Sequence, residues 1–148
     1  TPGKALNLGI QNSSFERIMI ISAHCVLKKI NLPKHYDDLN NYPCIFGNQI
    51  PIWNGKKIKK KYIWSHFVNQ EVVNMYSEFE ERYFLHNAIS LYKKDFIIDN
   101  PFDEYLLSKE DRYWCNEIVK KDNSFLYDPH LEVDHHYTIN GATWKGLR

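Results

Sequence analysis

An adjacent pair of carboxylates, Glu110 and Asp111, opens the stretch of this chain best suited to chemistry. The pair stands at the predicted start of a helix that continues through Trp114 and Ile118. A carboxylate held at a helix N-terminus beside an aromatic ring suits general-base work, because its surroundings tune its pKa and fix its direction. The pair is therefore a candidate for taking a proton from a hydroxyl group.

The same carboxylates have a structural interpretation. Ser108 precedes Asp111 by three residues, as in a capping box, where the serine caps the helix and the acidic side chain reaches back to the serine amide. Glu110 could orient a substrate, or simply favour the positive end of the helix dipole. The local pattern leaves both interpretations open.

Histidines supply a second candidate site. His24 follows an apolar run, and His135 and His136 stand at the end of a short predicted strand. Imidazole nitrogens bind transition metals, although a single histidine at a strand end is also an ordinary polar residue. Adjacent residues of a strand point to opposite faces, so at most one of His135 and His136 should serve the same site as His24.

The elements that must position these residues alternate between helix and strand. The apolar run from Ile18 to Ala23 predicts an interior strand of a parallel sheet, buried on both faces, with His24 at its C-terminal end. A stripe of Val68, Val72, Met75 and Phe79 predicts a helix. Other predicted strands are 44–50 (closed by Pro51), 86–92, 125–127 and 131–135, and other predicted helices are 4–14, 31–42 (with loops), 94–98 and 108–121.

Bulk properties limit the classes of function. A chain of 148 residues fits a single domain, and a net charge of +1 gives no drive toward nucleic acid. The basic run from Lys56 to Lys61 is typical of a solvated surface. Three cysteines without a C-x-x-C pair indicate a reducing, cytoplasmic setting, and no apolar run reaches transmembrane length. Glycine-rich phosphate loops are missing from the sequence.

Read in order, the motifs of the chain resemble family-2-like, inverting glycosyltransferases with the GT-A fold. The motifs are Lys4 to Ile10, Ile20 to His24, Phe46 to Pro51, His86 to Ser90, Pro101 to Glu104, Glu110 to Trp114, Tyr127 to Pro129, and His135-His136. The resemblance implies one α/β domain over residues 1–148, with a mixed, mostly parallel sheet flanked by helices. It also implies a fragment, because the N-terminal strand–helix–strand unit that holds the nucleotide base in this family has no counterpart.

The resemblance assigns roles to residues. It implies that Asp111 is the general base and that Glu110 assists it. It implies substrate contacts from Asn7, Asn87, Ser90 and Trp114, the last by stacking on an acceptor sugar. It further implies a divalent metal, Mn²⁺ or Mg²⁺, held by His24 and by His135 or His136. The family's Asp-x-Asp motif reads Ser22-Ala23-His24 here, which weakens the case for Mg²⁺ because this ion prefers oxygen ligands.

The function implied is transfer of a sugar, with inversion, from a nucleoside-diphosphate donor to a glycan or lipid-linked acceptor. The setting implied is the cytoplasm, at the inner face of the membrane, where the chain could associate peripherally. One alternative is a truncated or degenerate module that binds glycan or a partner chain without turnover. Another is a histidine-rich metal hydrolase, which would need a ligand set that converges in space.

Overall fold

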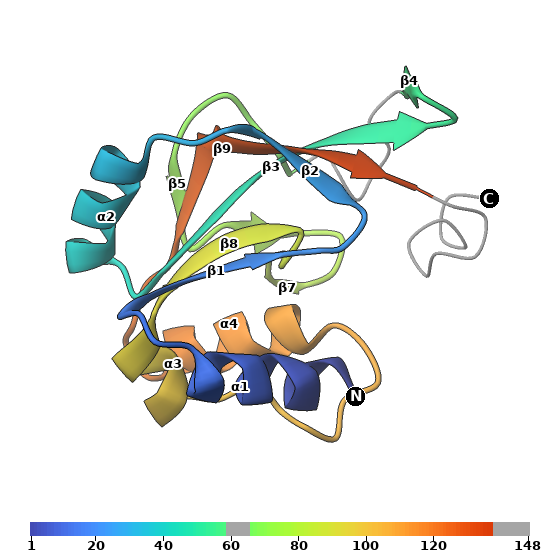
Figure 1. The fold of residues 1–148 in the computed structure, drawn as a ribbon. Coiled ribbons are helices and arrows are strands. Elements are labelled where there is room, and N and C mark those ends of the chain that lie inside the picture. The colour runs from blue at the N-terminus through green and yellow to red at the C-terminus, as the bar shows by residue number, and fades with distance from the viewer. Residues whose placement is uncertain (59–65, 138–148) are drawn as a thin grey trace.

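A curled, mostly antiparallel sheet dominates the computed structural model, which describes residues 1–58 and 66–137 (Figure 1). The main path across the sheet is β1-β8-β3-β9-β2. Its strands are β1 (Arg17–Ile21), β2 (Cys25–Lys29), β3 (Cys44–Trp53), β8 (Ile89–Lys93) and β9 (Leu126–His136). The short β4 (Lys56–Lys57) pairs with β3, β5 (Val72–Val73) pairs with β9, and β6 (Tyr76–Ser77) pairs with β7 (Arg82–Tyr83).

This architecture overturns the expected GT-A-like, mostly parallel sheet flanked by helices. Within the described part of the chain, the β3–β9 ladder is the one parallel pairing, and the other ladders are antiparallel. A parallel pair of strands needs a long crossover connection. A short connection instead joins antiparallel neighbours, or lets the chain pass from one edge of the sheet to the other. The apolar runs predicted the presence of strands but not their directions.

The two ends of the sheet path, β1 and β2, are consecutive in the sequence. Four inter-strand spacings of ~4.8 Å would separate them by about 19 Å in a flat sheet. Residues 22–24 and their flanking peptides span at most about 14 Å. The sheet must therefore curl until its two edges approach each other (Figure 1). The curl brings the turn between β1 and β2 to the end of β9, where the His24 carbonyl accepts the His136 amide.

The interior parallel strand predicted for Ile18 to Ala23 is wrong. The strand there is β1, which pairs antiparallel with β8 along one side and forms an edge of the sheet. Ile18 and Ile20 pack on the core, while Met19 is 39% exposed and Ile21 is 41% exposed. A continuous apolar run is compatible with both arrangements, so periodicity could not separate them.

Four helices of the described segments cover the sheet. They are α1 (Pro2–Asn12), α2 (Leu32–Asn41), α3 (Lys94–Asp99) and α4 (Glu110–Lys120). Helices α1, α3 and α4 gather on one side of the sheet, and α2 lies apart from them at the other side (Figure 1). The predicted helices at 4–14, 31–42, 94–98 and 108–121 are thereby confirmed, with boundaries shifted by a few residues.

The helix predicted from the stripe of Val68, Val72, Met75 and Phe79 is wrong. That segment forms β5 and β6 instead, and Asn74 between them has a φ of 50°. A left-handed residue breaks a right-handed helix. Met75 is buried and Phe79 is 71% exposed, so the apparent stripe is not a single buried face.

Strand β9 replaces the two short strands predicted around Asp128 and Pro129. Gly47 of β3 pairs with Asp128, and the next β3 residue, Asn48, pairs with Glu132. The intervening residues 129–131 are accommodated as an irregularity in one continuous strand. The strand predicted at 44–50 is confirmed, although it continues through Pro51 to Trp53. Lys59, Lys60 and Lys61 of the basic run lie outside the described residues.

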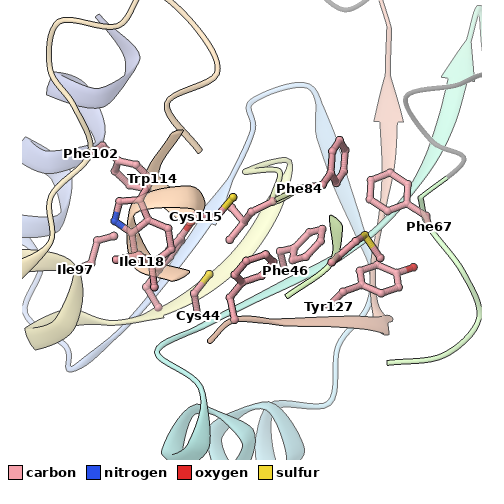
Figure 2. Close-up of a cluster of buried hydrophobic side chains, with 14 of the residues drawn as sticks. Cys44, Phe46, Phe67, Phe84, Ile97, Phe102, Trp114, Cys115, Ile118 and Tyr127 are labelled. Carbon is pink, nitrogen blue, oxygen red and sulfur yellow. The ribbon is translucent and has the colours of Figure 1, made fainter. Parts of the chain in front are cut away.

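An aromatic core fills the space between the sheet and helices α1, α3 and α4. Phe46, Phe84 and Tyr127 meet in it, with ring centroids of Phe46 and Tyr127 5.2 Å apart (Figure 2). A second cluster, around Leu39 of α2, covers the other face of the sheet. These two cores fix the positions from which the candidate site is built.

Candidate functional site

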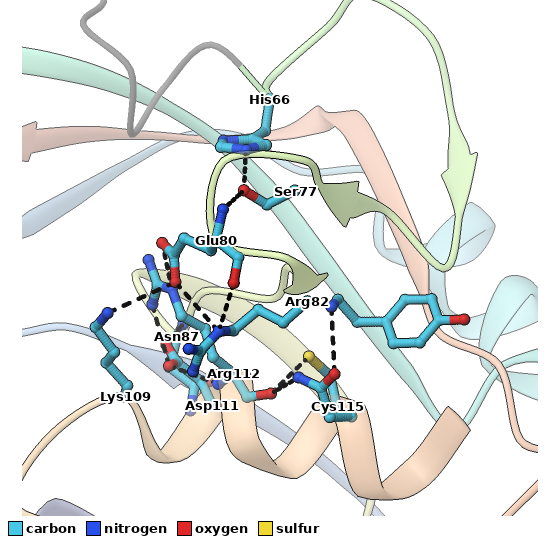
Figure 3. Close-up of polar contacts among 11 residues, drawn as sticks. His66, Ser77, Glu80, Arg82, Asn87, Lys109, Asp111, Arg112 and Cys115 are labelled. Carbon is cyan, nitrogen blue, oxygen red and sulfur yellow. Dashed lines mark hydrogen bonds and ion pairs between the residues drawn. The ribbon is translucent and has the colours of Figure 1, made fainter. Parts of the chain in front are cut away.

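Asp111 lies in the first turn of α4 with 4% of its surface exposed. Its Oδ2 accepts the backbone N–H of Asn87 at 2.9 Å, and its Oδ1 accepts the backbone N–H of Arg112 at 2.8 Å and the Arg112 guanidinium Nη1 at 3.2 Å (Figure 3). An ionised carboxylate offers about four acceptor positions. The three bonds leave room for one further donor.

The capping-box interpretation of Asp111 is wrong. Lys109, not Ser108, is the N-cap of α4, and it has a φ of 62° and no side-chain capping bond. Asp111 instead binds the amide of Asn87, which lies 24 residues earlier in the chain. The carboxylate therefore joins α4 to the segment that leads into β8.

An ion network holds Arg112 beside Asp111. The Arg112 Nε lies 3.3 Å from the Glu80 Oε1, and the Lys109 Nζ lies 3.6 Å from the Glu80 Oε2 (Figure 3). The Arg112 guanidinium also sits 4.7 Å from the centroid of the Phe84 ring. These contacts restrict Arg112 to one arrangement and keep its charge near Asp111.

Glu110 differs from its neighbour because it is only partly buried. Burial, followed by the nearby charge of Asp111, raises the pKa of Glu110 above its usual value. A raised carboxyl pKa makes a better proton acceptor near neutral pH. The two carboxylates thus divide into a fixed one, Asp111, and a more accessible one, Glu110.

The histidine cluster forms where the curled sheet brings β2 beside the end of β9. Cys25 and His135 are directly opposite each other in the β2–β9 ladder. The His136 amide donates to the His24 carbonyl at 2.9 Å, so the Cys25–His135 pair is a non-hydrogen-bonded one, in which side chains come closest. The ligand atoms of His24, Cys25 and His135 all lie within 4.8 Å of one another.

His135 is held in a defined orientation. Its Nδ1 lies 2.5 Å from the Gln49 Oε1 and 2.7 Å from the Tyr137 hydroxyl, while its buried Nε2 has no hydrogen-bond partner among the described residues. Burial, followed by the nearby His86 and His24, lowers the pKa of His135 to about 2, so the ring is neutral. His136 is exposed and His135 is 1% exposed, which leaves His135 as the member of the pair directed at the cluster.

His86 connects the two groups of residues. Its Nδ1 accepts the Ala88 amide at 3.1 Å, and its ring centroid lies 5.9 Å from that of His135. Burial, then the charges of Arg112 and His24, lowers the pKa of His86 well below its usual value. His86 was not predicted as a site residue, although its place beside Asn87 in a quoted motif was an available signal.

Asn87 and Ser90, predicted to contact substrate, meet each other. The Ser90 hydroxyl donates to the Asn87 Oδ1 at 2.7 Å, and Ser90 is fully buried. The backbone carbonyl of Asn87 accepts the Ser22 hydroxyl at 3.1 Å, close to the histidine cluster. The Asn87 Nδ2 is buried without a partner in the described part of the chain, so both of its N–H donors stay available.

Asn7 and Trp114, also predicted to contact substrate, lie away from the histidines. The Asn7 side chain exchanges hydrogen bonds with the backbone of Phe102, at 2.8 and 3.0 Å, and fastens α1 to the loop before α4. Trp114 is 4% exposed, and its Nε1 donates to the Asn100 carbonyl at 2.6 Å. Hydrogen bonds to the backbone account for the position of Asn7 and burial accounts for that of Trp114, so their contacts with substrate stay a prediction.

The Mg²⁺ or Mn²⁺ implied by the resemblance does not fit the residues that converge here. Hard cations such as Mg²⁺ prefer carboxylate and carbonyl oxygens. The cluster of His24, Cys25 and His135 offers two imidazole nitrogens and a thiol. Such a set suits borderline and soft metals.

No protein-family model matches the chain, and neither does any curated protein. The likeness to glycosyltransferases therefore depends on the residues quoted above. Among the helices of the described segments, none has the length and apolar character needed to cross a bilayer.

Proposed function

We propose that this chain takes part in sugar transfer from a nucleoside-diphosphate donor to the hydroxyl group of a glycan or lipid-linked acceptor. The observation that carries the proposal is the meeting of the Asp111 network and the histidine cluster through His86 and Asn87. The ordered motifs of the sequence supply the second support.

The carboxylates would act on the acceptor. Its hydroxyl would donate to the remaining acceptor position of Asp111, or to the more accessible Glu110. As the proton moves to the carboxylate, the hydroxyl oxygen forms a bond to the anomeric carbon and the bond from that carbon to the diphosphate oxygen breaks. Attack from the face opposite the leaving group inverts the configuration.

Neutral donors would stabilise the departing diphosphate. Because the His86 Nδ1 accepts the Ala88 amide, the proton of this neutral ring is on Nε2, which can donate to an anion. The Asn87 Nδ2, which has no partner within residues 1–58 and 66–137, is a second donor. Preorganised donors of this kind stabilise charge that develops in the transition state.

A second function, binding of glycan without turnover, is favoured by one observation. Asp111 is almost fully buried and already accepts three hydrogen bonds, which is typical of a structural carboxylate. In this case its role would be to join α4 to residue 87, and a sugar would bind without reacting.

Turnover distinguishes the two functions. We expect the protein, supplied with a panel of nucleotide sugars and saccharide acceptors, to release nucleoside diphosphate. If Asp111 is the base, Asp111→Asn should lower the rate by roughly 10²–10⁴-fold. If Glu110 is the base, Glu110→Gln should do so instead. Glu117→Gln is the control, because Glu117 is an exposed carboxylate of the same helix, paired with Lys120.

Two results would contradict the transfer reaction. One is a wild-type protein that binds a saccharide in calorimetry but releases no nucleoside diphosphate from any donor. The other is a rate that changes equally little in Asp111→Asn, Glu110→Gln and Glu117→Gln.

A further inference from the structure

We propose that Cys25 joins His24 and His135 as the third protein ligand of a zinc-type metal site, in place of the Mg²⁺ or Mn²⁺ site implied by the resemblance. The inference concerns which ion the histidine cluster binds. It does not depend on sugar transfer, because it rests on the ligand atoms alone.

The backbone already places the ligands. Cys25 and His135 face each other as a non-hydrogen-bonded pair, and His24 lies in the turn that leads into β2. In a tetrahedral zinc site, bonds of about 2.0–2.3 Å keep nitrogen and sulfur ligands roughly 3.5 Å apart. Ligand atoms that lie within 4.8 Å of one another need only side-chain adjustments to reach this spacing.

His135 is prepared as a ligand by its own neighbours. When its Nδ1–H donates to the Gln49 Oε1, the lone pair is on Nε2, the atom that has no partner among the residues the structure describes. Metal-binding histidines commonly have their second nitrogen held in this way, which fixes the tautomer and the ring direction. A metal at Nε2 would satisfy a buried acceptor that is otherwise left empty at some cost in free energy.

The chemistry of the three ligands selects the ion. Two imidazoles and one thiolate match the soft and borderline metals, with zinc the commonest partner of such a set. His24 is exposed, so the cluster reaches solvent on its side. Three protein ligands leave a fourth position open for water or for an anionic oxygen, as in zinc sites that act on substrates.

The Cys25 thiol can be distinguished from the other two thiols by its surroundings. Cys44 and Cys115 are fully buried in the core, whereas Cys25 is partly exposed and adjoins two histidines. A thiolate–metal band in the spectrum can therefore be assigned to Cys25 by a single substitution.

Cobalt titration of the metal-free protein tests the site. We expect one Co²⁺ to bind with a near-ultraviolet thiolate-to-metal charge-transfer band and visible bands of tetrahedral intensity, and Zn²⁺ to displace it while excess Mg²⁺ does not. Cys25→Ser should abolish the charge-transfer band, and His24→Ala should weaken binding by more than roughly 100-fold, above the loss typical of an outer-shell partner. Circular dichroism checks that each variant is folded.

His136→Ala is the matched control, because His136 is the exposed neighbour of His135 and is not part of the ligand set. It should bind Co²⁺ as the unaltered protein does. The proposal is overturned if Co²⁺ gives no charge-transfer band, if the band survives in Cys25→Ser, or if His136→Ala loses as much affinity as His24→Ala. A positive result without nucleotide-sugar turnover would reject the transfer reaction and keep the zinc site.

Discussion

Asp128 and His35 form a buried pair away from the candidate site. Both side chains are fully buried, and the His35 Nε2 lies 3.1 Å from the Asp128 Oδ2. The Lys34 Nζ donates to the same oxygen at 2.8 Å. Burial alone would raise the pKa of Asp128, but the hydrogen bonds from His35 and Lys34 outweigh burial and hold this pKa well below its usual value. The pair joins α2 to β9.

Replacing Asp128 should therefore make the protein less stable and less sensitive to acid. A lowered carboxyl pKa stabilises the folded state above the pKa of the unfolded chain, and this stability is lost as the pH falls below about 4. We expect Asp128→Asn to lower the free energy of unfolding near neutral pH by about 3 kcal/mol, since one partner of a buried pair is lost. Urea unfolding near neutral pH and in acid measures both effects.

Asp37→Asn serves as the control for this measurement, because Asp37 is an exposed carboxylate of the same helix. It should change the free energy of unfolding by less than about 0.5 kcal/mol. Equal losses in the two variants, or an unchanged acid transition in Asp128→Asn, would show that the Asp128–His35 pair contributes little.

Edge strand β1 is the element whose observed arrangement differs most from the one predicted from the sequence. Its position at one end of the sheet follows from its single ladder with β8. The Glu16 carbonyl accepts the Lys94 amide and the Ser22 amide donates to the Ala88 carbonyl. Because bonded residues alternate along an antiparallel strand, Ile18 and Ile20 also bond to β8, and the amides of Met19 and Ile21 point away from it.

Amide hydrogen exchange should show this alternation. We expect the amides of Ile18 and Ile20 to be protected, and those of Met19 and Ile21 to exchange much faster, when each is followed by NMR. Local exposure of unpaired amides is the physical reason. Equal protection of all four amides would indicate that a strand pairs with the outer side of β1, as in the interior strand first predicted.

The sequence predicted elements better than their arrangement. Helices such as α1 and α4 have a regular apolar spacing, and the run in β3 is long and apolar, so each could be found locally. The direction of each strand, and the edge position of β1, depend on contacts between segments distant in the chain. The helix predicted from four apolar residues does not form, because Asn74 has a left-handed backbone conformation. The spacing of the apolar residues did not indicate this conformation.

For the whole molecule, the curl of the sheet decides which candidate residues meet. It brings the rings of His24 and His135 together, although 111 positions separate these residues in the sequence. Two ligands of one metal ion must lie close together in this way. The sequence could not reveal Cys25 as their neighbour, because the β2–β9 register that places it opposite His135 is a long-range property. It also could not show that Asn7 is hydrogen-bonded to the backbone of Phe102 or that Trp114 is buried in the core.

His86 and His135 lie next to each other, with ring centroids 5.9 Å apart, and join the carboxylates to the histidine cluster. We expect both rings to be neutral and to have opposite tautomers. Two-dimensional NMR of the imidazole nitrogens measures this directly. Because burial lowers the pKa of both rings, we expect neither ring to become charged near pH ~6.5, where a free imidazole titrates. We also expect the proton to be on Nε2 of His86 and on Nδ1 of His135. Protonation of either ring near pH ~6.5, or a proton on Nε2 of His135, would show that this arrangement of the two rings is wrong.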